Sequence, residues 1–384
     1  MKYFMLGFSV LVLLISCNRE KVGFVNPKVE NILQFNDNKT SGAKIGELIN
    51  NINAIRLETN EECLIGNIEQ IRTSNGNLFI LDDQNHSVLV FDDHGDFLFK
   101  ISAQGKGPGQ YQFLRDFFID EIKNEIIVLG SPNKVMRFDM TGGFISEQSL
   151  DFTPLKFVSI NNERSYYFWN GINSINYAPL IKTDENFNLI ESYFAESEEE
   201  LTTSNMFTKF KESIYLRPFF DKHDKIIHEL TSTEIKSKYQ IDFGSRNWPE
   251  TIEINRDSKY REKGYIYGVT NFFEGRQWIT FNFTSEKIYH YAIYNKETQK
   301  SYWWPSFIAG TLPEAILSDI SFMEDDSFYS IAEPFYLKKY LDDFKKNDKE
   351  YDYSHISESL RNIYALLERV DELDNPIVFV LSLN

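Results

Sequence analysis

Cysteine is scarce in this 384-residue sequence, which contains only Cys17 and Cys63. Several disulfides therefore cannot staple the fold, and a packed core must stabilise it. A chain of this length can bury a large core. No recognisable motif surrounds Cys63, so we expect a buried core thiol there and not a nucleophile.

Basic residues are also in deficit. The sequence has 40 Lys and Arg against 57 Asp and Glu, a formal net charge of −17. Nucleic-acid binding needs clustered Lys and Arg, so the charge argues against a nucleic-acid partner. The sequence also lacks a Gly-x-Ser-x-Gly elbow, a His-Glu-x-x-His pair and an Asp-x-Asp-x-Asp-Gly loop. We therefore assign no catalytic or metal-binding residue from motifs and expect no cofactor.

Long apolar runs are confined to the N-terminus. Lys2 precedes the apolar stretch 4–15, and the small residue Ser16 comes directly before Cys17. This order is that of a secretory signal, and a run of about a dozen residues is shorter than the roughly 20 that span a bilayer. The sequence Leu-Ile-Ser-Cys at residues 14–17 resembles the lipobox of bacterial lipoproteins.

The lipobox resemblance implies a signal peptide over residues 1–17 and a diacylated Cys17. Each buried CH2 of an acyl chain contributes about 0.8 kcal/mol, and more than one chain makes membrane attachment stable. An ordinary signal peptide with a chance cysteine is the alternative. Residues 18–44 are polar and predict a tether. The sequence thus predicts a lipid-anchored protein of the cell envelope. Asn18 and Arg19 do not resemble the Asp-based signal for inner-membrane retention, so the outer membrane is favoured over the inner membrane as its location.

Aromatic residues are abundant, at 15% of the chain with 33 Phe and 21 Tyr, and they favour strands. Two segments repeat with a spacing of 47 residues between Phe91-Asp92 and Phe138-Asp139. Weaker copies follow at 156–194, 206–243, 265–304 and 316–332. A period of about 40 to 47 residues with four strands in each unit is typical of β-propeller blades.

The C-terminal region breaks this pattern. Residues 335–347 and 355–370 have helical spacing, and a last strand follows at 377–383. A ring of blades has no free edge only if its last blade is completed by a strand from the start of the chain. We therefore expect residues 52–57 and 377–383 in one shared blade. The predicted fold is all-β, a six-bladed β-propeller over 45–384 with a small helical insertion at about 335–370. A seven-bladed propeller is the alternative if the repeat around residues 206–260 is wrongly assigned.

The segment Gly-Lys-Gly-Pro-Gly at 105–109, followed by Phe117–Asp120, resembles the blade junction of NHL-repeat proteins. Residues 45–384 are similar to the six-bladed β-propeller lipoproteins of Bacteroides and its relatives. The features that match, besides Cys17, are Ile-Gly-Asn-Ile at 65–68, the Phe-Asp-x-x-Gly turns and the terminal strand. This resemblance implies a cell-envelope lipoprotein, in a family most of whose members have no established activity.

The junction loop 105–109 is not a P-loop, because its Gly-Lys is followed by Gly. Gly and Pro suit a tight crossing between blades. If this loop rings the mouth of a central channel, Lys106, Tyr111 and Arg115 are candidate ligand-binding residues. His228 and His290 fall at similar places in two strands, and the resemblance leaves open a channel metal as in propeller enzymes of the NHL type.

Five tryptophans could stack on sugars, and Trp303-Trp304 is the pair expected to be most exposed, although core packing is favoured for all five. The sequence favours a non-catalytic scaffold, attached to the membrane through its N-terminal lipid, that binds a protein, peptide or glycan. The alternative is an NHL-type propeller enzyme, a lactonase or lyase, with a metal in the channel. A third hypothesis is a sensor or assembly factor beside an outer-membrane transport system.

Overall fold

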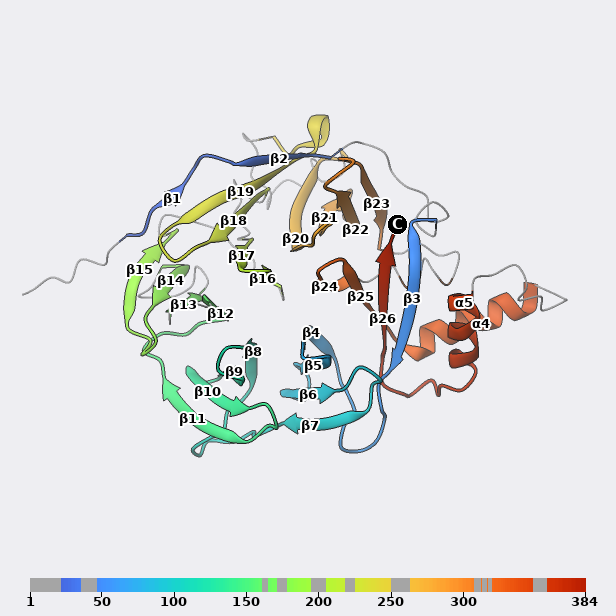
Figure 1. Cartoon of the computed structure of the whole chain (residues 1–384), viewed down its shortest axis with the longest axis horizontal. Helices are drawn as coiled ribbons and strands as arrows, with labels where there is room; N and C mark the ends of the chain where they lie inside the picture. Colours follow the sequence, from blue (N-terminus) through green and yellow to red (C-terminus); the bar gives the residue numbers. More distant parts are fainter. Residues whose placement is uncertain are drawn as a thin grey trace, which may run out of the picture.

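The computed structural model describes residues 22–35, 47–160, 165–170, 178–194, 205–217, 225–249, 263–306, 312, 316, 320–347 and 358–384. Within them, six sheets are arranged as a ring around a central axis (Figure 1). This is the expected six-bladed β-propeller. The segment 14–17 that resembles a lipobox lies outside the described residues. Among these residues, no helix is both long and apolar enough to cross a bilayer.

The first three blades are consecutive four-stranded units, each running from the inner strand to the outer strand. The first contains β4 (Ile68–Ser74), β5 (Asn77–Asp82), β6 (Ser87–Phe91) and β7 (Phe97–Ile101). The second contains β8 (Leu114–Asp120), β9 (Glu125–Gly130), β10 (Lys134–Asp139) and β11 (Phe144–Ser149). The third contains β12 (Lys156–Ile160), β13 (Ser165–Trp169), β14 (Leu180–Thr183) and β15 (Leu189–Tyr193).

The last three blades complete the ring. The fourth contains β16 (Phe207–Phe210), β17 (Ser213–Leu216), β18 (Ile226–Leu230) and β19 (Ile235–Asp242). A short 3-10 helix, η1 (Gly244–Arg246), follows it. The fifth contains β20 (Ile266–Glu274), β21 (Trp278–Ser285), β22 (Ile288–Asn295) and β23 (Ser301–Pro305). The sixth contains β24 (Ile320–Glu324), β25 (Ser327–Ala332), β26 (Ile377–Leu383) and β3 (Ile49–Arg56).

The same aspartate device shapes the turn between the third and fourth strands of the first three blades. One carboxylate oxygen of Asp92, Asp139 and Asp184 accepts N–H bonds from the residues two and four positions later. The residue three positions later has positive φ: Gly95 and Gly142 in the first two copies, and Phe187 in the third. Glycine adopts this left-handed conformation without steric cost, which explains the Phe-Asp-x-x-Gly pattern.

The ring closes where the sequence predicts. β26 pairs antiparallel with β3, and the register places Ile377 opposite Arg56 and Leu381 opposite Ile52. The strand from the start of the chain is therefore the outer strand of the last blade. This pairing supplies backbone partners that the edge of β26 would otherwise lack.

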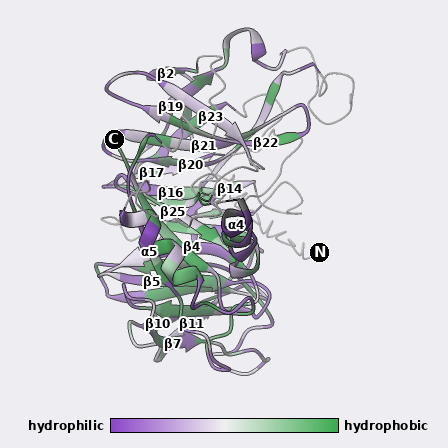
Figure 2. Ribbon diagram, turned by 90° about the vertical axis from the view of Figure 1, so that its right-hand side faces the viewer, coloured by the Kyte–Doolittle hydropathy of each residue, from purple (hydrophilic) through white to green (hydrophobic). Residues whose placement is uncertain are grey.

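The helical insertion lies between β25 and β26. Helices α4 (Pro334–Asn347) and α5 (Glu358–Leu367) cover the outer side of the sixth blade, the side that faces the viewer in Figure 2. Leu337 and Leu341 of α4, with Ile363 of α5, join the buried cluster that contains one apolar face of β26. These helices therefore extend the core outward.

The expected tether is wrong in the described part of residues 18–44. β1 (Val25–Asn26) and β2 (Asn31–Gln34) pair parallel with β19 and lengthen the fourth blade. Phe35 then lies buried against Phe243, Phe281 and Phe283. The polar composition did not indicate this docking. The segment pairs with β19 through its backbone and buries only alternate side chains, so few of its residues need to be apolar. We call residues 22–35 the N-terminal strap.

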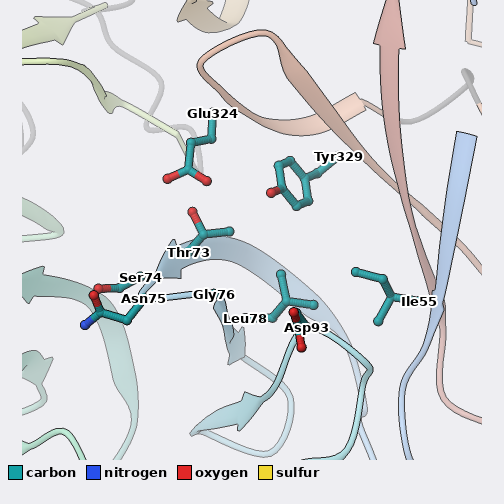
Figure 3. Close-up of a pocket in the computed structure, with 9 residues that line it drawn as sticks. All are labelled: Ile55, Thr73, Ser74, Asn75, Gly76, Leu78, Asp93, Glu324 and Tyr329. Carbon is teal, nitrogen blue, oxygen red and sulfur yellow. The ribbon is translucent and has the colours of Figure 1, made fainter. Parts of the chain in front are cut away.

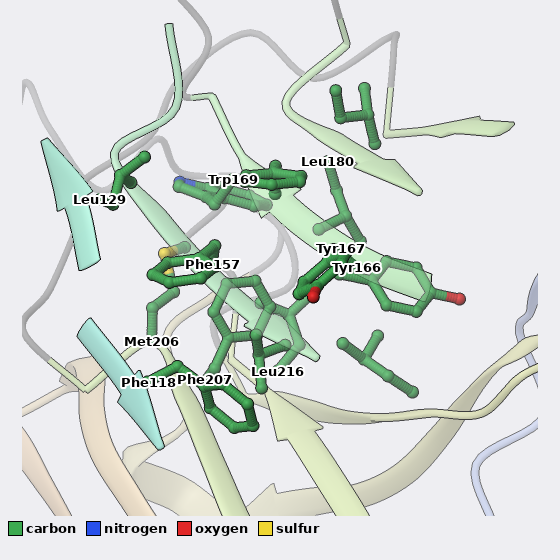
Figure 4. Packing of buried hydrophobic residues seen from close by; sticks show 14 of the residues in the cluster. Phe118, Leu129, Phe157, Tyr166, Tyr167, Trp169, Leu180, Met206, Phe207 and Leu216 are labelled. Carbon is green, nitrogen blue, oxygen red and sulfur yellow. The ribbon is translucent and has the colours of Figure 1, made fainter. Parts of the chain in front are cut away.

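Aromatic side chains fill the space between blades. One cluster joins the second, third and fourth blades and contains Phe118, Phe157, Trp169, Phe207 and Leu216 (Figure 4). All five tryptophans are buried, including Trp303 and Trp304, so the preference for core packing is confirmed. Cys63 is also buried, and its thiol donates to the Glu58 carbonyl oxygen at 3.1 Å. Burial raises the pKa of this thiol, as expected for a core residue.

Candidate functional site

The three candidate residues around the junction loop do not form one site. Tyr111 is fully buried; its hydroxyl donates to the His86 carbonyl oxygen at 2.8 Å and accepts the Ala103 N–H at 3.1 Å. Burial raises the pKa of Tyr111 to about 12. A ligand at the surface cannot reach this side chain, so its predicted role in binding is wrong. Tyr111 instead holds the loop from inside the core.

The junction loop also lies further from the central axis than expected. The Gly109 N–H donates to Glu147 Oε2 of β11 at 2.8 Å, and β11 is the outer strand of the second blade. Lys106 is exposed on this loop. Arg115 lies elsewhere, on the inner strand β8, where its guanidinium donates to the Pro154 carbonyl oxygen at 2.7 Å. Ligand binding by Lys106 and Arg115 stays a prediction.

Charged side chains meet where the inner strands of the first three blades approach one another. Lys156 of β12 lies 3.3 Å from Glu69 of β4 and donates to the Arg115 carbonyl oxygen at 3.4 Å. Arg72 of β4 donates to the Phe117 carbonyl oxygen at 3.1 Å, with its guanidinium 4.0 Å from the carboxylate of Asp116. We call Glu69, Arg72, Asp116 and Lys156 the inner-strand ion cluster.

The inner-strand ion cluster supplies hydrogen-bond partners to backbone groups on the free edges of β8 and β12. Inner strands have no neighbour on the side of the axis, so their N–H and C=O groups there need other partners. Side chains of β4 and β12 donate to two β8 carbonyls, and Asp116 Oδ2 accepts the Phe157 N–H at 2.9 Å. Burial raises the pKa of Asp116 and lowers that of Arg72. This arrangement has a structural purpose, because it ties three blades together.

A pocket of about 210 Å³, lined by both polar and apolar groups, lies at the seam between the sixth and first blades (Figure 3). The β4–β5 turn forms one wall, and β24 and β25 of the sixth blade form the other. We call it the seam pocket; its lining residues are Ile55, Thr73, Ser74, Asn75, Gly76, Leu78, Asp93, Glu324 and Tyr329. The lining contains two carboxylates and no Lys or Arg.

Polar groups of the seam pocket converge on its interior. In Figure 3 the Glu324 carboxylate and the Thr73 hydroxyl point toward one another, with the Tyr329 phenol beside them. The Thr73 hydroxyl oxygen is buried and has no hydrogen-bond partner among the described residues. Burial, with a smaller contribution from the Glu324 charge, raises the pKa of Tyr329 to about 12. Tyr329 is therefore a neutral hydrogen-bond donor near pH 7.

The β4–β5 turn brings these groups into place. Asn75 and Gly76 have φ values of +51° and +81°, which suits a two-residue hairpin turn of the primed type. The Asn-Gly dipeptide is a recognisable turn signal, but a turn signal does not by itself indicate a site. The two walls come from residues about 250 positions apart, so no local pattern could join them.

The two histidines considered for a channel metal lie in the third strands of different blades. His228 of β18 packs with its ring centroid 5.4 Å from that of Phe194. His290 of β22 stacks on Phe283 at 5.0 Å and contacts Trp303 at 5.2 Å. In the described part of the chain, no group of three or more His, Cys, Asp or Glu side chains is arranged to hold a metal ion.

The fold is that of a six-bladed β-propeller, with a small hollow at the seam between its first and last blades. A family model described as "Domain of unknown function (DUF4934)" matches residues 29–382, and the chain belongs to this family. Its likeness to a putative exported protein from Bacteroides fragilis has a TM-score of 0.73 at 20% identity, and covers 92% of this chain and 100% of the other. This likeness shows the propeller fold.

A second solved structure, a member of the DUF4221 family from Bacteroides vulgatus, matches with a TM-score of 0.47 at 10% identity. That match covers 88% of this chain and 99% of the other. No protein with a curated description matches the sequence.

Proposed function

We propose that this propeller is a non-catalytic binding scaffold of the cell envelope, anchored through lipid on Cys17, that binds a protein, peptide or glycan at the seam pocket. The observation that carries the proposal is the Thr73 hydroxyl. It is buried in the pocket wall without a partner among the described residues, although buried polar groups are nearly always hydrogen-bonded. A ligand that reaches the pocket supplies the missing partner.

The lining defines what such a ligand must offer. Glu324 and Asp93 accept hydrogen bonds and carry negative charge, so the ligand group presents N–H or O–H donors and is neutral or cationic. Pockets for drug-sized ligands measure about 300 to 1,000 Å³. The seam pocket, at about 210 Å³, is smaller and accommodates one side chain or part of one sugar of a larger ligand.

The envelope location rests on the N-terminal sequence. The apolar run 4–15 and the lipobox-like segment ending at Cys17 support export followed by lipidation. The solved propeller from Bacteroides fragilis is described as a putative exported protein, which agrees with this location. Outer membrane is favoured over inner membrane because Asn18 follows the cysteine where the retention signal has Asp.

The proposal is tested by pull-down from native membranes with the lipidated full-length protein, followed by mass spectrometry of the bound material. The pocket variant combines Thr73→Val with Glu324→Gln. Glu121→Gln is the matched control. Like Glu324, Glu121 is an acidic residue where the first strand of a blade turns into the second, but it lies on the second blade, outside the pocket.

We expect wild type and Glu121→Gln to retain the same stoichiometric partner and the pocket variant to lose it. The identity of that partner decides between a glycan binder and a sensor or assembly factor. Equal retention by the pocket variant, or no specific partner with wild type, contradicts the proposal.

A further inference from the structure

Exposed apolar side chains lie along the edge where the N-terminal strap meets β15, the outer strand of the third blade. Val22 and Phe24 of the strap are 72% and 67% exposed. Leu189 and Ile190, at the start of β15, are also exposed. The two segments are joined, since Val22 forms a parallel bridge with Ser192 and the Gly23 N–H donates to the Ser192 carbonyl oxygen at 2.8 Å. We call Val22, Phe24, Leu189 and Ile190 the apolar rim.

The strap fixes this rim to the ring. Gly23 packs so closely on Tyr193 that a Cβ there would lie 2.0 Å from the ring. The chain then continues along β19 through β1 and β2 and ends this contact with the buried Phe35. Residue 22 is therefore held at the outer edge of the third blade and does not swing on a long linker.

The apolar rim is close to Cys17 in sequence, and this closeness indicates that a membrane covers the rim. Val22 is only five residues after Cys17, and five extended residues reach at most about 18 Å. If Cys17 carries lipid, as proposed above, the rim lies within this distance of the membrane surface. Exposed Phe, Leu, Ile and Val side chains beside a lipid anchor are suited to the boundary between headgroups and acyl chains.

We infer that the apolar rim inserts into the headgroup–acyl boundary of the membrane that holds the Cys17 lipid. The propeller then stands on the outer edge of its third blade. In a ring of six blades the sixth lies opposite the third, as β15 and β26 do in Figure 1. The seam pocket, between the sixth and first blades, therefore lies on the half of the ring away from the bilayer, where a partner in solution can reach it.

The test uses the full-length lipidated protein in vesicles of phosphatidylethanolamine and phosphatidylglycerol. Phe24→Cys and Ile190→Cys are each labelled with an environment-sensitive fluorophore. Leu373→Cys is the matched control, because Leu373 is 85% exposed and lies just before β26 on the sixth blade. Unsubstituted protein reports any labelling of the buried Cys63.

We expect a blue shift at positions 24 and 190 and loss of their emission when the vesicles contain spin-labelled lipid, with neither effect at position 373. Equal, water-like emission at all three positions overturns the inference. A blue shift that depends on protein concentration, without quenching by lipid, also overturns it and indicates a second copy on the rim.

Mass spectrometry of Cys17 on the same sample separates the two claims. An unacylated Cys17 contradicts the anchor in the proposed function. An acylated Cys17 with a water-like signal at Phe24 contradicts only the placement of the rim.

Discussion

At the scale of single residues, Tyr111 shows how a polar side chain can support a loop without serving a ligand. Its hydroxyl bonds to backbone groups of His86, Ala103 and Ile101, and its own N–H and C=O bond to Ala103 and Gly105. The sequence places Tyr111 beside an exposed Gly-rich loop and so suggests a rim residue. The aromatic ring instead enters the core between the first and second blades.

Removal of the Tyr111 hydroxyl tests this structural role. We expect Tyr111→Phe to lower the free energy of unfolding by about 1 to 2 kcal/mol, because the His86 carbonyl and the Ala103 N–H lose a buried partner. Lys106→Ala, on the exposed part of the same loop, should change it by less than about 0.5 kcal/mol. Urea titration measures both variants, and equal effects would contradict the assignment.

Glu147 gives the same loop a dependence on pH. Its hydrogen bond from Lys134 at 3.0 Å, with that from the Gly109 N–H, lowers the pKa of Glu147 below its ordinary value of 4.5. A lowered carboxyl pKa stabilises the fold above the ordinary pKa, and this contribution is lost as the pH falls through the folded-state pKa.

We therefore expect Glu147→Gln to be less stable than wild type at pH 7, by about 0.5 kcal/mol because the pair is partly exposed. The difference should shrink to nothing in acid. Denaturation at a series of pH values measures it, and a difference that grows toward low pH would show that the sign is wrong.

At the scale of elements, strands complete one another across long sequence distances. β3 finishes the sixth blade, β1 and β2 lengthen the fourth, and the inner-strand ion cluster caps the edges of β8 and β12. Each case supplies partners to backbone groups at a sheet edge. The N-terminal strap is thus part of the folded ring, and its removal should affect stability.

A pair of substitutions on the strap tests this docking. Phe35→Ala should cost about 3 to 5 kcal/mol, because the ring is buried among Phe243, Phe281 and Phe283. Ile32→Ala, at an exposed position of β2, should cost less than about 0.5 kcal/mol. Thermal and urea unfolding measure both, and a mild effect of Phe35→Ala would indicate that the strap is only loosely attached.

At the scale of the whole molecule, the propeller was predictable because its blades repeat and its ends must meet. The Phe-Asp turns recur at the spacing of one blade, and a ring without a free edge requires the first and last strands, β3 and β26, to pair. The strap was missed because a strand that docks on one edge buries only alternate residues, such as Leu33 and Phe35.

The seam pocket could not be predicted from the sequence for a different reason. Its walls come from the first and last blades, and Thr73 and Glu324 carry no signal of their proximity. The Asn75-Gly76 turn was visible in the sequence, but a turn alone does not indicate a hollow. Sequence periodicity reports which face of a strand is buried, and it does not report where two blades leave a gap.

The central claim is that the ligand meets the propeller at the seam pocket and not at the junction loop. Photo-cross-linking in living cells tests it most directly, with benzoylphenylalanine placed at Asn75 in the pocket wall or at Lys106 on the loop. We expect a discrete cross-linked species from position 75 and none from position 106. A cross-link from position 106 alone would contradict the account.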